Sequence, residues 1–217
     1  MSNALRNELV RVGRSLFARG YVHASAGNLS ARTDGGTLIT PTDACLGFLD
    51  PAQLAFVDDA GIQQSGARAS KTLALHRAIY AAEPTARCVL HTHSTHLVAL
   101  TLAGVWSDAA VLPPITPYFV MKVGQVPLVK YRRPGDPEVA NNVPALAGAA
   151  RQRGAPIRAV LLERLGPVVW HETPAAAMAV LEELEETARL WLMSNPKPAP
   201  LTEKQLAELR THFGATW

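Results

Sequence analysis

Two histidines separated by one residue are the clearest chemical signal in the sequence. His91 and His93 follow a short apolar run that begins at Cys88 and favours a β-strand. Side chains two residues apart in a strand project to the same face, so both imidazoles can converge on one point and hold a metal ion. The alternative is a pair of histidines that hydrogen-bond to the backbone at a strand end. His96 falls where a helix should begin, and we interpret it as a capping or surface residue.

A second group of residues has the composition of an anion site. Free backbone N–H groups and the dipole at a helix N-terminus favour negative charge, and small hydroxyl or amide side chains leave room for it. Lys71 would add a full positive charge directly before an expected helix. Ordinary roles in capping and in a turn remain open for Ser70 and Asn28. The segments concerned are Ser25–Asn28, Thr40–Asp43 and Ala69–Lys71.

Tyr118 is a third candidate, within the segment 115–121. A tyrosine beside a metal ion or a carbonyl group can donate a proton. The alternative is an amphipathic core residue whose hydroxyl reaches water.

Hydrophobic periodicity indicates the elements that must hold these residues in place. Apolar residues at helical spacing predict a first helix that Ser2 or Asn3 caps and Gly20 ends. Two short strands are expected at 29–31 and 38–40, joined as a hairpin across Asp34-Gly35-Gly36. Further strands are predicted at 55–57, 88–91, 125–129, 159–162 and 168–170, and further helices at 72–82, 95–103, 138–151 and 174–193.

This mixture of strands and helices indicates one three-layer α/β domain. We expect a single domain over 1–217, with a Pro-rich linker and a C-terminal helical arm at about 196–217 that docks on a neighbour.

Composition narrows the functional classes. The chain has 217 residues, of which 48% are hydrophobic and 18% charged, as in an ordinary globular protein. No stretch approaches the ~18 apolar residues that span a bilayer, and the N-terminus lacks the pattern of a secretory signal, so we expect a cytoplasmic protein without a membrane partner. Cys45 and Cys88 lie too far apart for a C-x-x-C site. The net charge of +3 is scattered, and its densest group, 130–133, does not predict nucleic-acid binding.

Taken in chain order, seven segments resemble the class II aldolase/adducin superfamily. They are 20–30, 39–42, 46–50, 69–71, 75–76, 91–94 and 166–169. Within this superfamily, the segments 116–121, 127–136 and 184–188 are most similar to the 3-oxo-tetronate 4-phosphate decarboxylase branch.

The resemblance implies a three-layer α/β/α fold with a central mixed or antiparallel sheet, and a homotetramer with its sites at subunit interfaces. It also implies a divalent metal, zinc above all, held by three histidines, together with a glutamate acid/base and a phosphate pocket. By position, His91 and His93 correspond to two metal ligands, and Tyr118 to an active-site tyrosine. The anion pocket corresponds to Asn28, Thr42, Ser70 and Lys71, and we expect the adjacent Asp43 and Thr72 to contact the substrate and Lys71 to take part in catalysis.

Three departures from the family pattern fall on the chemistry. Leu165 stands where the third histidine is expected, Thr72 where the glutamate is expected, and Asp43 beside the anion site where the family has glycine. A catalytic zinc normally keeps three protein ligands, so we expect metal binding to be weakened or absent. Arg164, next to the lost ligand, could polarise a carboxylate or enolate without metal, and the alternative is a surface ion pair. Candidate replacement ligands are His23, His96, His171, Asp43 and Glu163.

The missing glutamate favours one reaction over another. Aldol cleavage and epimerisation need a base, and a threonine hydroxyl has no useful pKa near neutrality. Decarboxylation of a 3-oxo acid needs only stabilisation of the enolate and a later proton. The sequence therefore predicts a carbon–carbon lyase, a decarboxylase acting on a small oxygenated and anionic 3-oxo acid. Alternatives are a non-catalytic ligand-binding member of the fold and an enzyme repurposed for metal-free chemistry.

Overall fold

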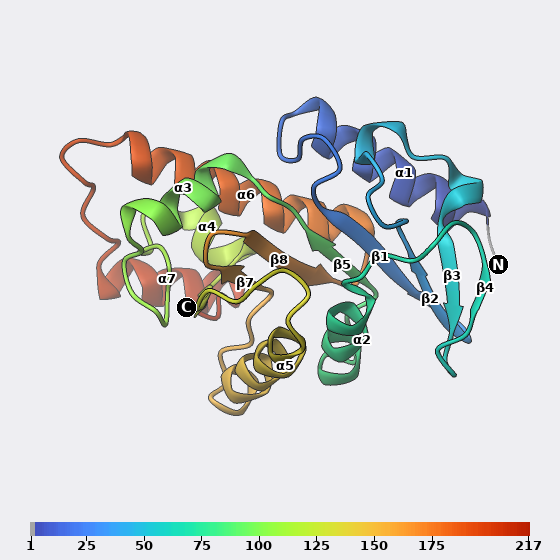
Figure 1. The fold of residues 1–217 in the computed structure, drawn as a ribbon. Coiled ribbons are helices and arrows are strands. Elements are labelled where there is room, and N and C mark those ends of the chain that lie inside the picture. Colours follow the sequence, from blue (N-terminus) through green and yellow to red (C-terminus); the bar gives the residue numbers. More distant parts are fainter. Residues whose placement is uncertain (1–2) are drawn as a thin grey trace.

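A mixed sheet of eight strands forms the centre of the protein. The computed structural model describes residues 3–217, and the strands lie in the order β4-β3-β2-β1-β5-β8-β7-β6. All neighbouring strands are antiparallel except β6 and β7, which are parallel. Helices cover both faces of the sheet, with α1, α3, α4 and α6 on one side and α2 and α5 on the other (Figure 1). The three-layer α/β/α fold is thus confirmed, and its sheet is mixed.

The strands follow the predicted pattern with two differences. They are β1 (Asn28–Thr33), β2 (Gly36–Ile39), β3 (Ala55–Asp58), β4 (Gln63–Ser65), β5 (Cys88–His91), β6 (Leu128–Val129), β7 (Ala159–Leu162) and β8 (Gly166–His171). The hairpin of β1 and β2 turns at Asp34-Gly35, where Gly35 has the positive φ of 80° that such a turn requires. Strand β4 was not expected because its residues are polar and exposed. Strand β6 keeps only the last two residues of the segment predicted at 125–129.

The described residues form seven α-helices, of which the last four begin at a side-chain cap. They are α1 (Asn3–Ala18), α2 (Leu73–Ala82), α3 (Thr95–Ala103), α4 (Pro117–Lys122), α5 (Pro137–Gln152), α6 (Pro174–Met193) and α7 (Glu203–Phe213), with short 3-10 turns η1 (Leu46–Phe48) and η2 (Pro51–Gln53). Thr116, Asp136, Thr173 and Thr202 accept a backbone N–H at the starts of α4 to α7. The expected α1 cap at Ser2 lies outside the described residues, and Asn3 is already helical.

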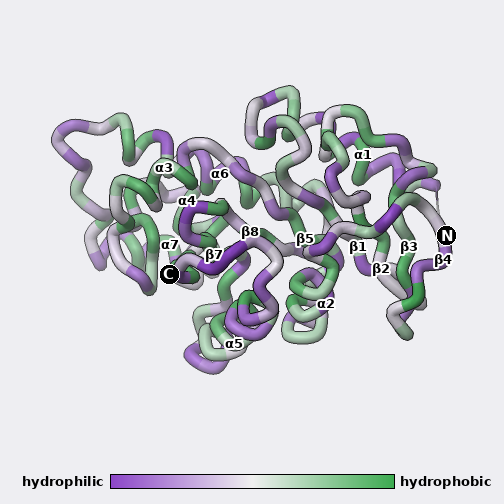
Figure 2. The backbone as a smooth tube through the Cα atoms, viewed as in Figure 1, coloured by the Kyte–Doolittle hydropathy of each residue, from purple (hydrophilic) through white to green (hydrophobic). Residues whose placement is uncertain are grey.

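Two apolar cores lie on opposite faces of the sheet. The larger includes Leu16, Leu90 and Leu181 from α1, β5 and α6, and the smaller includes Ile79 and Val143 from α2 and α5. Figure 2 shows hydrophobic and hydrophilic residues alternating along α5, as expected of a helix with one buried face. Strand β5 contributes Leu90 to one core and Val89 to the other, so it is packed on both faces up to the residues at its end.

The C-terminal segment packs against its own chain. Leu201 donates a backbone hydrogen bond of 2.8 Å to the Pro114 carbonyl, and Leu206 of α7 is buried. The Trp217 ring lies 5.4 Å, centroid to centroid, from Phe119 of α4. Contact with a neighbouring subunit is thus not needed to position the arm. Across residues 3–217, no helix combines the length and apolarity needed to cross a membrane.

Candidate active site

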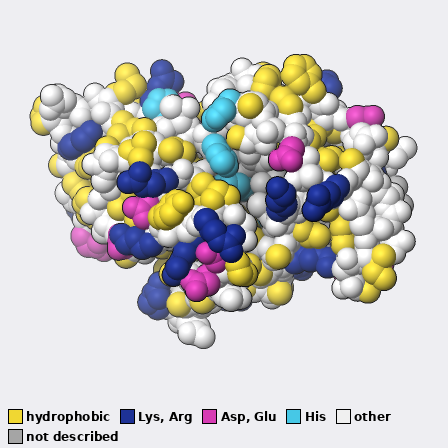
Figure 3. Space-filling model, in the orientation of Figure 1, with side chains coloured by type: hydrophobic (Ala, Val, Ile, Leu, Met, Phe, Trp, Pro, Cys, Tyr) yellow, Lys and Arg dark blue, Asp and Glu magenta, His cyan; other side chains and the backbone are white. Residues whose placement is uncertain are grey.

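A cavity of about 440 Å³ opens beside the end of β5. Its wall is built from the turns before β1 and after β2, the start of α2, the end of β5, the loop before α5 and the turn between β7 and β8. Histidine side chains lie along a recess in the molecular surface, and Lys and Arg side chains flank it (Figure 3). The cavity therefore joins segments that are far apart in the sequence.

His91 and His93 both line this cavity, with ring centroids 5.0 Å apart. The Nδ1 of His91 lies 2.9 Å from the Pro167 carbonyl oxygen, which can only accept, so Nδ1 carries the proton and donates it. Burial, reinforced by His93, lowers the pKa of His91 to about 4, so the ring is neutral at pH 7 and its Nε2 keeps a lone pair. Burial and the nearby His23 also lower the pKa of His93.

The turn between β7 and β8 reaches the histidine pair because Gly166 has no side chain. A Cβ atom at Gly166 would lie 2.2 Å from the backbone oxygen of Thr92, and its φ of 111° is unfavourable for other residues. The Thr92 N–H donates to the Pro167 carbonyl at 3.3 Å. This close approach places Leu165 on the cavity wall with His91 and His93.

Leu165 supplies no atom that could bind a metal ion, and it stands where the resemblance led us to expect a third histidine. His171 cannot replace it, because it pairs with Cys88 at the opposite end of β5. Among residues 3–217 there is no group of three or more His, Cys, Asp or Glu side chains that could hold a metal ion. The residues present therefore do not fit the three-ligand site of a catalytic zinc.

The other candidate replacement ligands have different positions. Glu163 accepts the Tyr131 N–H at 2.8 Å, and His96 bonds to Glu185. His23 helps to lower the pKa of His93 but does not line the cavity. Asp43 is the one of these candidates that lines the cavity.

The structure brings all six predicted anion-site residues to this cavity. They are Asn28, Thr42, Asp43, Ser70, Lys71 and Thr72. The hydroxyl oxygens of Ser70 and Thr72 lie 2.9 Å apart just before α2, and the Thr72 hydroxyl does not cap the helix. The Lys71 ammonium makes no hydrogen bond or ion pair within the described chain. A free cation and two hydroxyl groups at a helix start are suited to an anionic ligand.

A buried chain of hydrogen bonds orients Asn28. The side-chain oxygen of Asn28 lies 2.7 Å from Nε2 of His76, which is fully buried. An amide oxygen only accepts, so Nε2 carries the proton, and because burial lowers the pKa of His76 to about 3, Nδ1 must accept from Ser30 Oγ at 2.7 Å. The Ser30 hydroxyl then accepts from the Tyr80 hydroxyl, also at 2.7 Å. This polarity leaves the amide N–H groups of Asn28 available to a bound anion.

Tyr118 and Arg164 do not line the cavity of the single chain. The side chain of Tyr118 lies on α4 and is 60% exposed. Arg164 has a φ of 64° in the β7–β8 turn, and its backbone N–H donates to Thr101 Oγ1 at 3.0 Å. Arg164 is next to Leu165 in the sequence, but only Leu165 lines the cavity, because successive side chains in this turn point in different directions.

Ser25 lines the wall as the predicted segment Ser25–Asn28 implies, whereas sequence reasoning missed the segment 133–137. The sequence showed Arg133 only as part of a basic group and of a segment similar to the decarboxylase branch, and neither observation predicts that the fold brings it to the cavity of His91 and His93. The available signal was the sequence Arg133-Pro-Gly-Asp136 before an expected helix, because Pro-Gly indicates a turn and Asp can cap the helix that follows.

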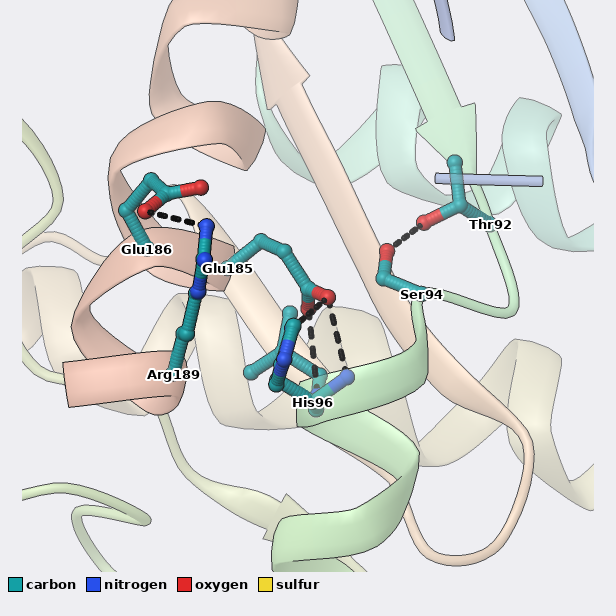
Figure 4. Close-up of polar contacts among 7 residues, drawn as sticks. Thr92, Ser94, His96, Glu185, Glu186 and Arg189 are labelled. Carbon is teal, nitrogen blue, oxygen red and sulfur yellow. Dashed lines mark hydrogen bonds and ion pairs between the residues drawn. The ribbon is translucent and has the colours of Figure 1, made fainter. Parts of the chain in front are cut away.

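Glu185 of α6 fixes the chain directly after the histidine pair. Its Oε1 accepts from the backbone N–H of His96 at 2.9 Å and from His96 Nδ1 at 2.8 Å, and its Oε2 accepts from the Leu97 N–H at 3.1 Å. Figure 4 shows this carboxylate pointing at the start of α3, beside the 2.6 Å hydrogen bond between Thr92 and Ser94. The side chain of Glu185 is 2% exposed. A carboxylate at a helix N-terminus accepts hydrogen bonds from the free N–H groups, and its negative charge interacts favourably with the helix dipole.

Comparisons with known proteins find relatives along nearly the whole chain. The family described as "Class II Aldolase and Adducin N-terminal domain" matches residues 7–192. A 3-oxo-tetronate 4-phosphate decarboxylase of Cupriavidus necator is 57% identical over 98% of this chain and 97% of its own length. A protein of the same name from Escherichia coli K12 is 42% identical over 97% of each chain.

Solved structures show the same fold. The crystal structure of YgbL from Escherichia coli has a TM-score of 0.87 and 43% identity, covering 96% of this chain and 98% of its own. An L-fuculose 1-phosphate aldolase has a TM-score of 0.81 at 21% identity, covering 99% of this chain and 98% of its own, and supports the fold alone.

Proposed function

Because the chain belongs to the class II aldolase and adducin family, we propose that it is a carbon–carbon lyase that decarboxylates a small phosphorylated 3-oxo acid. The observation that carries this proposal is the cavity itself. It combines the neutral imidazole of His91, the free ammonium of Lys71 and the oriented amide of Asn28. The 57% identical relative carries the name of that activity.

The reaction breaks the bond between the carboxylate carbon and its neighbour, and the electron pair moves to the 3-oxo group as an enolate. A positive charge fixed in a partly enclosed cavity stabilises such an anion, and we assign this role to Lys71, which lies between Ser70 and Thr72 and also attracts the phosphate. Asn28, Thr42, Ser70 and Thr72 donate hydrogen bonds to the phosphate, with Asp43 at the edge of this pocket. No base is needed to begin, which suits a site with threonine at position 72.

We propose that the usual metal is bound weakly or not at all, since Leu165 replaces the expected ligand. Each tenfold loss of affinity corresponds to about 1.4 kcal/mol. His91 and His93 remain as a two-residue site on the cavity wall.

We further propose a homotetramer in the cytoplasm. Tyr118 as proton donor and Arg164 as a stabilising charge can act only where assembly brings them to a cavity, because neither lines the cavity of its own chain.

The presence of Thr72 and Leu165 on the same wall favours a second candidate function, that of a ligand-binding protein without turnover. An enzyme repurposed for other metal-free chemistry is the remaining alternative. A binding protein needs the anion pocket and neither of the two lost groups. The double variant Thr72→Glu, Leu165→His should then gain both metal and turnover.

The test is carbon dioxide release from 3-oxo-tetronate 4-phosphate, measured against the uncatalysed rate. We expect catalysis by the native chain, a loss of at least tenfold in Lys71→Gln, and none in Lys122→Gln, whose exposed side chain does not line the cavity. Binding of the phosphorylated acid without any release of carbon dioxide above background would instead establish the second candidate.

A further inference from the structure

The loop before α5 places one free guanidinium on the cavity wall. Arg133 lines the cavity, and its side chain has no hydrogen-bond or ion-pair partner in the part of the chain that the structure describes. The turn that carries it is defined by the Asp136 N–H, which donates to the Arg133 carbonyl at 3.1 Å, and by Gly135 with a φ of 78°.

The residues on either side of Arg133 are each held by a specific contact. Lys130 pairs with Asp108 at 2.8 Å, and the Tyr131 N–H donates to Glu163 at 2.8 Å. These contacts fix the path of the chain from β6 into the loop.

The contacts continue beyond Arg133. Arg132 pairs with Glu138 at 2.7 Å, and Asp136 caps α5 by accepting the Glu138 N–H at 3.0 Å. The loop is thus anchored through its other polar residues, while the arginine that lines the cavity has no partner.

Lys71 is the other cation on the wall without a partner, and it belongs to a different segment, at the start of α2. A ligand with a single anionic group needs only one of these charges. A ligand with anionic groups at both ends can satisfy both, and a guanidinium matches the two oxygens of a carboxylate in a bidentate arrangement.

We propose that Arg133 is a specificity-determining residue that binds the carboxylate of the substrate, so that the cavity selects phosphorylated sugar acids over phosphorylated sugars that lack a carboxylate. This inference rests on the proposed function for the identity of the acid. It assigns the phosphate to the segment around Lys71 and the carboxylate to Arg133, at separate parts of the wall.

The experiment compares two unreactive probes by calorimetric binding. Erythronate 4-phosphate carries both a carboxylate and a phosphate, and erythritol 4-phosphate has the same chain with an alcohol in place of the acid. Arg133→Gln should weaken binding of the acid by about tenfold to a hundredfold, the range for removal of a charge-assisted partner, and change binding of the alcohol by less than about twofold. Arg133→Lys should lose part of the preference because it keeps the charge and loses the planar fork.

Arg132→Gln is the matched control, since this neighbouring arginine is paired with Glu138 and does not line the cavity. It should leave binding of both probes unchanged. Arg133 is exposed and unpaired, so its replacement removes no folding contact. Equal weakening of both probes in Arg133→Gln, no weakening of the acid, or failure of the native chain to bind the acid would overturn the proposal.

The two proposals fail in different ways. If the native chain prefers the acid and Arg133→Gln abolishes that preference, but no carbon dioxide is released, then carboxylate recognition stands and the decarboxylase function falls. If carbon dioxide is released and the substitution leaves the preference intact, the opposite holds.

Discussion

Replacement of Glu185 by glutamine should destabilise the protein far more than the same change at the next residue. Both oxygens of the Glu185 carboxylate accept hydrogen bonds, from the two backbone N–H groups of His96 and Leu97 and from the His96 ring. Glutamine keeps one oxygen and puts an NH₂ group where the other was, so at least one buried donor faces another donor. In Glu186→Gln, by contrast, the change affects a half-exposed pair with Arg189 at 3.7 Å (Figure 4).

The size of the effect follows from the contacts. Loss of a hydrogen bond to a charged group costs about 1.5–3 kcal/mol, and leaving a buried donor unsatisfied costs about 1–3 kcal/mol. Removal of the buried charge recovers part of its desolvation cost, so we expect a net loss of about 2 kcal/mol in the free energy of unfolding. For a domain of this size that lowers the melting temperature by roughly 4–8 °C. The Glu186→Gln control should change the free energy of unfolding by less than about 0.5 kcal/mol.

Urea denaturation at one fixed protein concentration measures both variants, because assembly makes apparent stability depend on concentration. Binding of erythronate 4-phosphate is the second readout, since a loosened start of α3 also loosens the segment that carries His93. If the two variants unfold at the same urea concentration, the capping role assigned to Glu185 is wrong.

Three further results are expected. Leu165→His should let the chain retain about one zinc ion per subunit in elemental analysis, and a metal-free variant would show that the wall differs from a three-ligand site in more than this residue. Because burial lowers the pKa of His91 to about 4 and of His76 to about 3, the unfolded chain binds more protons than the folded chain below about pH 6.5. The free energy of unfolding should therefore be highest above that pH. Below it, the free energy of unfolding should fall by up to about 1.4 kcal/mol per pH unit for each histidine, down to about pH 4. A free energy of unfolding that stays constant in urea denaturation from about pH 7.5 to 5 would contradict this. Gly166→Ala should cost at least about 2 kcal/mol in thermal unfolding, whereas Gly148→Ala, in a helix with open space around the added carbon, should be neutral or stabilising, and equal effects would contradict the close approach described above.

Local patterns predicted much of the fold and of the site. The hairpin at Asp34-Gly35 and the strand ending at His91 follow from turn chemistry and alternation, which act between neighbouring residues. The anion-site residues were predicted as a group because a lysine and small polar residues beside free N–H groups at a helix start favour an anion, and the structure places them on one wall. Their chemical roles stay predictions.

Features that depend on distant parts of the chain could not be read in the same way. Nothing local places Arg133 in the same cavity as the histidines, since that depends on which face of the sheet α5 covers. Glu185 lies in an acidic stretch of α6 that reads as a solvated face, and only the packing of α3 on α6 makes it a buried cap. Tyr118 and Arg164 show the same limitation, because being near the chemistry in sequence did not bring them to the cavity.

The buried chain from Tyr80 to Asn28 has a spectroscopic consequence. The Nε2 proton of His76 is sealed from water and hydrogen-bonded at 2.7 Å, so it should exchange slowly and give a resolved imidazole resonance in a proton NMR spectrum. A ligand that accepts a hydrogen bond from the side-chain NH₂ group of Asn28 polarises the side-chain carbonyl of Asn28. The hydrogen bond between this carbonyl and His76 then changes, and the His76 resonance shifts. The protein thus contains an internal reporter of cavity occupancy that needs no label and no turnover.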